Sequence, residues 1–106
     1  MDLVNPHFLE GEIDGKDVSH FGTLLCTIKR GTRLCVITNP SSKGMYLAFK
    51  NSPDGTTCQA VVGKGIYCPS NGGGYEMSPV NIGQTEVWAI HDDANATHRM
   101  CIQLGE

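Results

Sequence analysis

The chain lacks the features by which several classes of protein are recognised. It has 106 residues, of which only 7% are aromatic and 18% charged. No apolar run approaches the roughly 20 residues of a membrane-spanning helix, and no C-x-x-C pair marks a redox site. Residues 1–6 carry an acidic residue and end in proline, unlike the basic and then apolar start of a signal peptide. We therefore expect a soluble chain that does not bind a membrane.

A hydrophobic content of 40% argues against disorder, and 13 glycines without an apolar heptad argue against a coiled coil. The glycines and five prolines instead separate short stretches of β-branched, aromatic and aliphatic residues. Such stretches recur about every 8–12 residues, which is typical of small all-β domains. The sequence therefore predicts a small β-sandwich or barrel of seven to eight short antiparallel strands. The expected strands cover residues 23–29, 33–38, 45–50, 57–62, 66–68, 75–78, 85–91 and 98–104.

The alternation of apolar residues predicts which side chains face the interior. Leu24, Cys26 and Ile28 are expected to share one face, and residues 33–38 are apolar enough for a central strand. The last two expected strands are separated by the polar residues 92–97, which favours a closing hairpin.

Residues 1–22 differ from the rest, because glycines and a proline interrupt any regular period. We interpret them as an extended N-terminal arm, followed by a β-sandwich domain of residues 23–106. The apolar side chains of the arm need a surface, on their own domain or on a neighbouring chain. The alternative is a first strand of the same sheet. The interface candidates are Phe8, Leu9, Ile13 and Phe21.

Charge is distributed unevenly, although the net formal charge is only -3. It sums to -4 over residues 1–17, to +5 over residues 29–64 and to -4 over residues 65–106. Segments of opposite sign can attract each other within a chain or between copies, but charges that average out on a solvated surface explain the pattern as well. The overall acidity argues against nucleic-acid binding.

Five cysteines are many for this length, and an odd number cannot all pair within one chain. They are too far apart in sequence to supply the close ligand pairs of a zinc site, so we expect no metal. One interpretation is that they are small buried hydrophobic residues. The other is one or two disulfides, some between chains, formed outside the reducing cytosol. The disulfide candidates are Cys26, Cys35, Cys58, Cys68 and Cys101.

No group of residues forms a catalytic motif, so we expect neither an enzyme nor a cofactor. His91, Asp93 and His98 are the nearest approach to a metal site, but an ordinary polar turn explains them better.

A carbohydrate-binding β-sandwich, lectin-like or used for adhesion to a host surface, is the alternative function. Its stacking surface would be Tyr67, Tyr75 and Trp88. A tryptophan in a sandwich strand is, however, by default a core residue.

The segment from residue 33 to residue 104 resembles small β-sandwich accessory proteins of tailed bacteriophage virions. The shared features are a Gly-Ile-Tyr entry at residues 65–67, a turn rich in proline and glycine with a short aromatic-led strand at residues 69–77, and a closing Val-Trp-Ala-Ile … Ala-Thr … Arg-Met-Cys-Ile-Gln stretch at residues 87–103. The resemblance implies a capsid cement, decoration or head-fibre protein without catalytic residues. The five cysteines and the acidic arm depart from the family pattern.

From this resemblance we expect a structural virion protein that binds and stabilises a bacteriophage capsid. It would be made in the host cytoplasm and located on the capsid surface. Its partners would be the major capsid protein or other virion proteins, and further copies of itself, with a trimer as one option. The arm can add a strand to a neighbour's sheet, and cysteines reduced during assembly can cross-link chains in the released virion.

Overall fold

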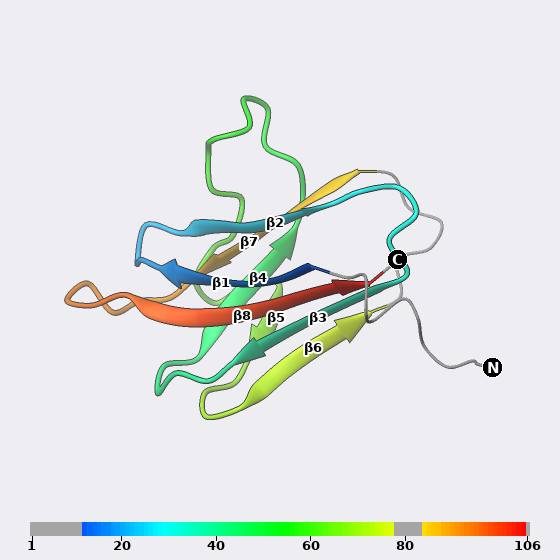
Figure 1. Cartoon of the computed structure of the whole chain (residues 1–106). Coiled ribbons are helices and arrows are strands. Elements are labelled where there is room, and N and C mark those ends of the chain that lie inside the picture. Colours follow the sequence, from blue (N-terminus) through cyan, green and yellow to red (C-terminus); the bar gives the residue numbers. More distant parts are fainter. Residues whose placement is uncertain (1–11, 78–83, 106) are drawn as a thin grey trace.

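The structure, a computed structural model, describes residues 12–77 and 84–105. Within these ranges the chain forms eight strands and no helix, and accordingly no helix there is long and apolar enough to cross a membrane. All strand pairs are antiparallel, so the predicted fold class is confirmed (Figure 1). The strands are β1 (Glu12–Val18), β2 (Thr23–Ile28), β3 (Leu34–Asn39), β4 (Met45–Phe49), β5 (Ile66–Cys68), β6 (Gly73–Met77), β7 (Thr85–Ile90) and β8 (His98–Gly105).

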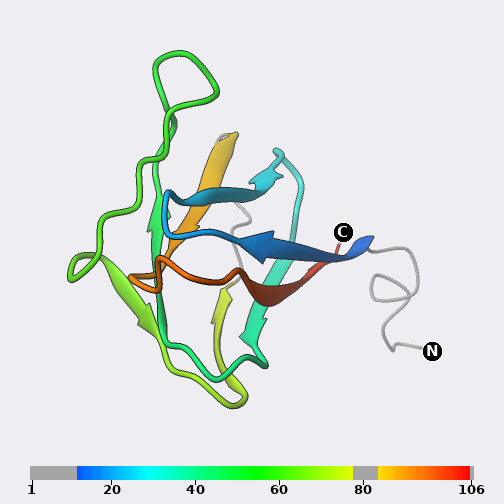
Figure 2. The same cartoon turned by 90° about the vertical axis from the view of Figure 1, so that its left-hand side faces the viewer.

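The strand order shows a long hairpin that has been rolled up. β1 pairs with β8, β2 with β7, β3 with β6 and β4 with β5, so the first four strands meet the last four in reverse order. Further pairing of β3 with β8 and of β4 with β7 completes two sheets, β1-β8-β3-β6 and β2-β7-β4-β5. Eight antiparallel strands in this arrangement form a jelly roll, a sandwich of two sheets (Figure 2).

Apolar side chains that alternate along the strands fill the space between the sheets. Met45 and Leu47 of β4 and Met100 and Ile102 of β8 face inwards, as their spacing predicts. β3 lies between β8 and β6, which confirms that it is a central strand. The core cluster consists of Val18, Leu25, Ile28, Cys35, Ile37, Met45, Leu47, Cys68, Val87, Ala89, Met100 and Ile102.

A β-bulge in β2 changes the inward-facing set that the sequence predicts. The register with β7 shifts between Leu24 and Cys26, which makes Leu25 the extra residue. Leu24 lies opposite Trp88, whereas Cys26 lies opposite Val87, a core residue. Leu25 and Cys26 therefore both reach the interior, and the prediction that Leu24 shares a face with Cys26 is wrong.

Residues 12–18 belong to the sandwich. β1 pairs with β8 along its whole length, and Val18 is fully buried. The structure thus differs from the predicted arm of residues 1–22 over residues 12–18. These residues form a first strand of the same sheet, which was the alternative interpretation. The pairing with β8 explains the difference, since it fixes a segment whose own sequence has no clear period. Residues 1–11 lie outside the described residues.

β7 and β8 do not pair with each other, although their sequences predict a hairpin. β7 lies between β2 and β4, and β8 lies between β1 and β3 in the other sheet. Where β7 ends, the ring of His91 is buried and binds the carbonyl of Val18 at the end of β1 (Nε2–O 2.7 Å). This contact directs the chain across the edge of the sandwich. Alternation alone does not distinguish a hairpin from two strands in different layers.

Residues 57–62, expected as a strand, belong to the long connection between β4 and β5. Oδ1 of Asp54 accepts the N–H groups of Thr56 and Thr57, each at 2.9 Å. These bonds hold the pKa of Asp54 well below its usual range, because they favour the charged carboxylate. They also close a turn that competes with strand pairing, and the edge of β4 is already occupied by β5.

Six of the seven connections between successive strands cross from one sheet to the other; only the β4–β5 connection stays within its sheet. The backbone at such crossings leaves the sheet and needs other hydrogen-bond partners. Thr32, Asn39 and His91 are the polar residues buried in the described ranges, and each lies at or beside a crossing.

Asn39, at the end of β3, has the most partners. Its Nδ2 donates to the carbonyls of Lys43 (2.7 Å) and Cys68 (3.2 Å), while its Oδ1 accepts from the N–H (3.1 Å) and hydroxyl (2.6 Å) of Ser41. Its own carbonyl accepts the N–H of Gly72 at 2.7 Å. One buried amide thus joins the β3–β4 and β5–β6 connections.

Replacement of Asn39 by leucine tests this role. Asn39→Leu keeps the approximate side-chain volume but leaves the carbonyls of Lys43 and Cys68 without their donor. We expect the free energy of unfolding to fall by about 2–4 kcal/mol, the cost of two buried unsatisfied acceptors, as measured by urea denaturation. The exposed Asn95 gives a matched control, and Asn95→Ala should change stability by less than about 0.5 kcal/mol. Equal stability of both variants would contradict the assignment.

Candidate functional site

The outer faces of the two sheets differ in what covers them. Residues 50–65, between β4 and β5, run along the outer side of the β2-β7-β4-β5 sheet (Figure 2). Val87 and Ala89 of β7 are core residues, so Trp88 between them points outwards, yet it is only 4% exposed. Ala60 of the connection is buried as well. The connection therefore covers this face. Trp88, which the sequence predicts as a core residue, lies beneath the connection on the outer side of the sheet.

Glu86 fastens this connection to the sheet. Its Oε1 accepts hydrogen bonds from the N–H (2.7 Å) and hydroxyl (2.9 Å) of Ser52 and from Nε1 of Trp88 (3.0 Å). Its N–H donates to Oδ1 of Asn51 at 2.7 Å. The donors hold the pKa of Glu86 below its usual range, the N–H of Ser52 having the largest effect.

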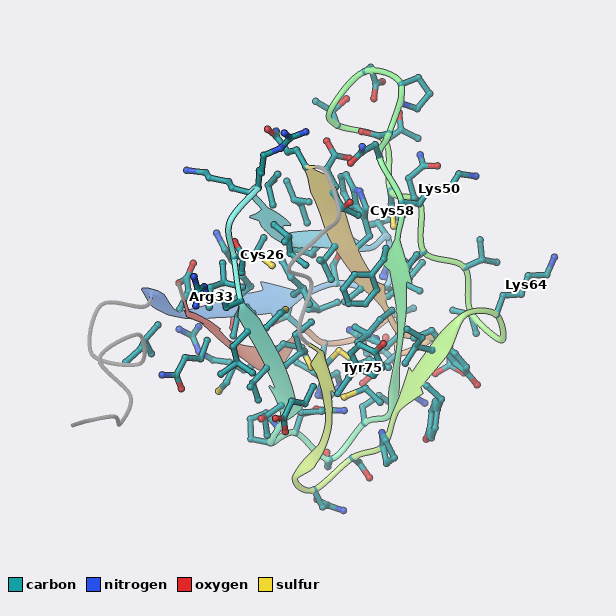
Figure 3. All side chains as sticks on the ribbon, turned by 90° about the vertical axis from the view of Figure 1, so that its right-hand side faces the viewer. Cys26, Arg33, Lys50, Cys58, Lys64 and Tyr75 are labelled. Atoms are coloured by element: carbon teal, nitrogen blue, oxygen red, sulfur yellow. The ribbon has the colours of Figure 1, made fainter. Side chains whose placement is uncertain are left out.

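Cys58 provides a second attachment. It lies against Gly22, where an added Cβ would be 2.1 Å from the Cys58 sulfur. Gly22 also has a φ of 94°, which other residues rarely adopt. Figure 3 shows Cys58 on the inner side of the connection, while Lys50 and Lys64 project away from it into solvent.

The β1-β8-β3-β6 sheet has no comparable cover within the described ranges, and Figure 1 shows its strands in front of the molecule. The register arranges its outward side chains in rows across the strands. In the middle row Cys101 stands between Gly15 and Thr38, so this part of the face is flat. We call this surface the open face; its residues are Ile13, Gly15, Asp17, Leu34, Val36, Thr38, Arg99, Cys101 and Gln103.

An exposed ion pair lies at one end of the open face. Nη1 of Arg99 is 3.0 Å from Oδ1 of Asp17 on the neighbouring strand. The guanidinium passes over Gly15, where a Cβ would be 2.7 Å from Nη2. Both side chains are more than half exposed, so the pair adds little to folding stability and is available to a partner.

Two of the predicted interface residues are large, exposed and apolar. Ile13, on the open face, is 81% exposed, and Phe21, in the β1–β2 connection, is 76% exposed. They mark the two ends of β1, the edge strand of its sheet. Phe8 and Leu9 lie outside the described residues.

None of the five cysteines is in a disulfide in the structure. Cys35 and Cys68 are fully buried, which fits the interpretation as small hydrophobic residues. Burial raises the pKa of the Cys68 thiol. Cys26 and Cys58 are partly buried, and Cys101 is exposed on the open face. Cross-linking of chains stays a prediction, and Cys101 is the cysteine best placed for it.

The three rings proposed for carbohydrate stacking lie at three separate places. Trp88 is beneath the β4–β5 connection. Tyr75 packs against Phe49 between the sheets, with ring centroids 5.5 Å apart (Figure 3). Tyr67 on β5 is 53% exposed, and its ring lies 5.1 Å from that of Tyr46. Of the three predicted rings, Tyr67 alone offers a free surface to a sugar.

His91, Asp93 and His98 do meet, at the β7–β8 connection. The two imidazole rings lie 4.8 Å apart, and Nε2 of His98 is 2.8 Å from Oδ2 of Asp93. The bond with His98 lowers the pKa of Asp93. The N–H of Asp93 donates to Nδ1 of His91 at 3.0 Å, so the proton of His91 is on Nε2 and is donated to the carbonyl of Val18. Both ring nitrogens of His91 are thus hydrogen-bonded to backbone groups.

The geometry therefore gives this cluster a structural role. No group of three or more His, Cys, Asp or Glu side chains in residues 12–77 and 84–105 is arranged to hold a metal ion.

Comparison of the chain with protein-family models, with curated proteins and with solved structures found no match.

Sequence reasoning missed the anchoring role of Glu86 and the inward position of Leu25. The signal for Glu86 was present, since a carboxylate two residues before a tryptophan in a strand shares its face. The position of Leu25 depends on the bulge, which leaves no mark in the sequence of β2.

Acid should release the β4–β5 connection. Because the folded-state pKa of Glu86 lies below its unfolded value of about 4.3, its contribution is present above that pH and lost as pH falls through the folded pKa. We expect the emission of Trp88, the single tryptophan, to shift to longer wavelength as the pH falls below about 4.3. In Glu86→Gln the emission wavelength should depend less on pH. Glu76→Gln is the matched control, since Glu76 is exposed, and it should keep the pH dependence of the wild type. An unchanged profile in Glu86→Gln contradicts the role.

Proposed function

We propose that this protein is a structural component of a bacteriophage virion that binds the capsid and stabilises it, and that it is not an enzyme. The observation that carries the proposal is the open face, a sheet surface that no segment of residues 12–77 and 84–105 covers and that ends in an edge strand. The jelly-roll topology supports it by analogy, since this fold recurs in viral capsid domains. The fold also occurs in lectins, so it does not by itself define a function.

The open face has the composition of a protein-binding surface. Ile13 and Val36 supply apolar contact area, and Arg99 and Asp17 add charge at one end. Specific interfaces likewise combine apolar and polar side chains.

The edge strand β1 supplies a second means of attachment. Among the described strands it pairs with β8 alone, so its other edge can take a strand of a neighbouring chain along the part that precedes Asp17. Ile13 and Phe21 at its two ends would be buried by such a neighbour. The partner is the major capsid protein, another virion protein or a further copy of this chain.

A carbohydrate-binding module is the second candidate, and the exposed Tyr67 favours it. The buried Trp88 argues against it, because a ring that is 4% exposed cannot stack on a sugar.

Capsid binding can be tested with particles of the encoding phage assembled without this chain. The purified protein should sediment with them and raise the temperature at which they release DNA. Ile13→Asp should weaken binding by roughly ten- to a hundredfold, because burial of an isoleucine contributes about 1.5–3 kcal/mol. Val61→Asp is the matched control, since Val61 is an exposed aliphatic residue of the other sheet's connection, and it should bind like the wild type.

Three results would contradict the proposal. One is failure of the protein to bind the particles. Another is equal binding of both variants, which would exclude the open face. The third is binding to a glycan array that is lost in Tyr67→Ala but kept in Ile13→Asp, which would favour the carbohydrate-binding alternative.

Cross-linking between chains gives a further prediction that rests on this function. Cys101 is exposed between small neighbours on the open face, so two copies or a copy and the capsid protein can bring sulfurs together there. Non-reducing electrophoresis of released particles should show a band larger than the monomer, absent in Cys101→Ser and retained in Cys58→Ser. A clean monomer band from wild-type particles is the contrary result.

A further inference from the structure

Cys26 and Cys35 come from opposite sheets and meet inside the sandwich. Cys35, on β3, is fully buried and belongs to the core cluster. Cys26, on β2, packs against the same cluster. Cys26 lies opposite Val87 of the core and two residues before the buried Ile28, so its side chain faces inwards.

The two side chains are in direct contact. The Cys26 thiol donates a hydrogen bond to the sulfur of Cys35, which lowers the pKa of Cys35 against the opposing effect of its burial. Figure 3 shows the sulfur of Cys26 on the inner side of the turn that leads past Arg33 into β3. A disulfide between them requires the two sulfurs to approach to about 2.05 Å, with a Cβ–S–S–Cβ dihedral of roughly 90°.

We propose that Cys26 and Cys35 form a dithiol pair that closes to an intrachain disulfide between the two sheets when the protein meets a small-molecule disulfide such as oxidised glutathione. The proposal does not depend on the proposed function, since it concerns the isolated chain. The sequence left five cysteines as disulfide candidates, and the proposal assigns one intrachain pair among them.

The exchange proceeds in two balanced steps. The partly exposed Cys26, as a thiolate, attacks oxidised glutathione, forms a mixed disulfide and releases one glutathione thiolate. The Cys35 thiolate then attacks the sulfur of Cys26 and releases the second. The two thiol protons pass to the two glutathione thiolates, so one disulfide is reduced as one is formed.

The other cysteines are not placed to compete for either partner. Cys58 lies against Gly22 and donates to the carbonyl of Ala60 (3.5 Å). Cys68 donates to the carbonyl of Gly73 (3.5 Å). Cys101 points to the open face, away from the core.

Peptide mapping of the wild-type chain tests the proposal directly. Lys29, Arg30 and Arg33 lie between the two cysteines, so trypsin separates them into peptides 17–29 and 34–43. After incubation of the folded protein with oxidised glutathione and alkylation of the remaining thiols, these two peptides should be recovered joined. The intact protein should have lost two hydrogens, carry three alkylated cysteines and run as a monomer without reductant.

Thermal unfolding provides a second readout. The cross-link closes a short loop and restricts the unfolded chain, so the oxidised protein should melt roughly 10 °C above the reduced protein. Cys26→Ser should lose both the joined peptides and this rise. The double variant Cys58→Ser, Cys101→Ser should keep both, since it retains the proposed pair.

Two results would overturn the proposal. One is recovery of peptides 17–29 and 34–43 separately, each with an alkylated cysteine, from oxidised wild-type protein. The other is a link from either peptide to a third cysteine. Both results come from the wild-type chain, so they do not depend on whether a variant folds.

Discussion

The constraint on which this structure depends is that its chain changes sheet at almost every turn. Backbone groups that leave one sheet before they enter the other must be hydrogen-bonded by something else, and buried polar side chains supply the bonds. Asn39 joins the β3–β4 and β5–β6 connections, and at the same end of the sandwich His91 binds the end of β1 through the carbonyl of Val18. Neither residue belongs to the apolar core, yet the packing of the two sheets requires both crossings to be held.

This arrangement makes the two outer faces unequal. The β4–β5 connection alone stays within its sheet, and its length allows it to fold back over that sheet and cover Trp88. The opposite sheet receives no such cover from the described segments, and its outward residues are a mixture of apolar, small and charged side chains. The asymmetry, rather than any single residue, separates a protected side from a side suited to contact.

The fold class and most of the core followed from the sequence, because period-two alternation in β3, β4 and β8 directly reflects which side chains are buried. Pairing did not follow. The position of β8 between β1 and β3 depends on contacts distant in sequence, and the bulge in β2 depends on β7. The same limit applied to the candidate site: Ile13 and Phe21 were recognisable as apolar residues without a place in the core, whereas the meeting of Cys26 with Cys35 depends on how the two sheets pack.

The nested order of the strands has a consequence for how the protein is made. β8 is the last of these eight strands to leave the ribosome, and it lies inside its sheet between β1 and β3. β1 therefore has no partner strand until β8 has been synthesised. β3, on the other side of β8, likewise has no partner strand until β6 and β8 have been synthesised. Only β4 and β5 are both adjacent in sequence and paired. Folding should start at this innermost pair and proceed outwards, and β1 should be paired last, once β8 has been synthesised.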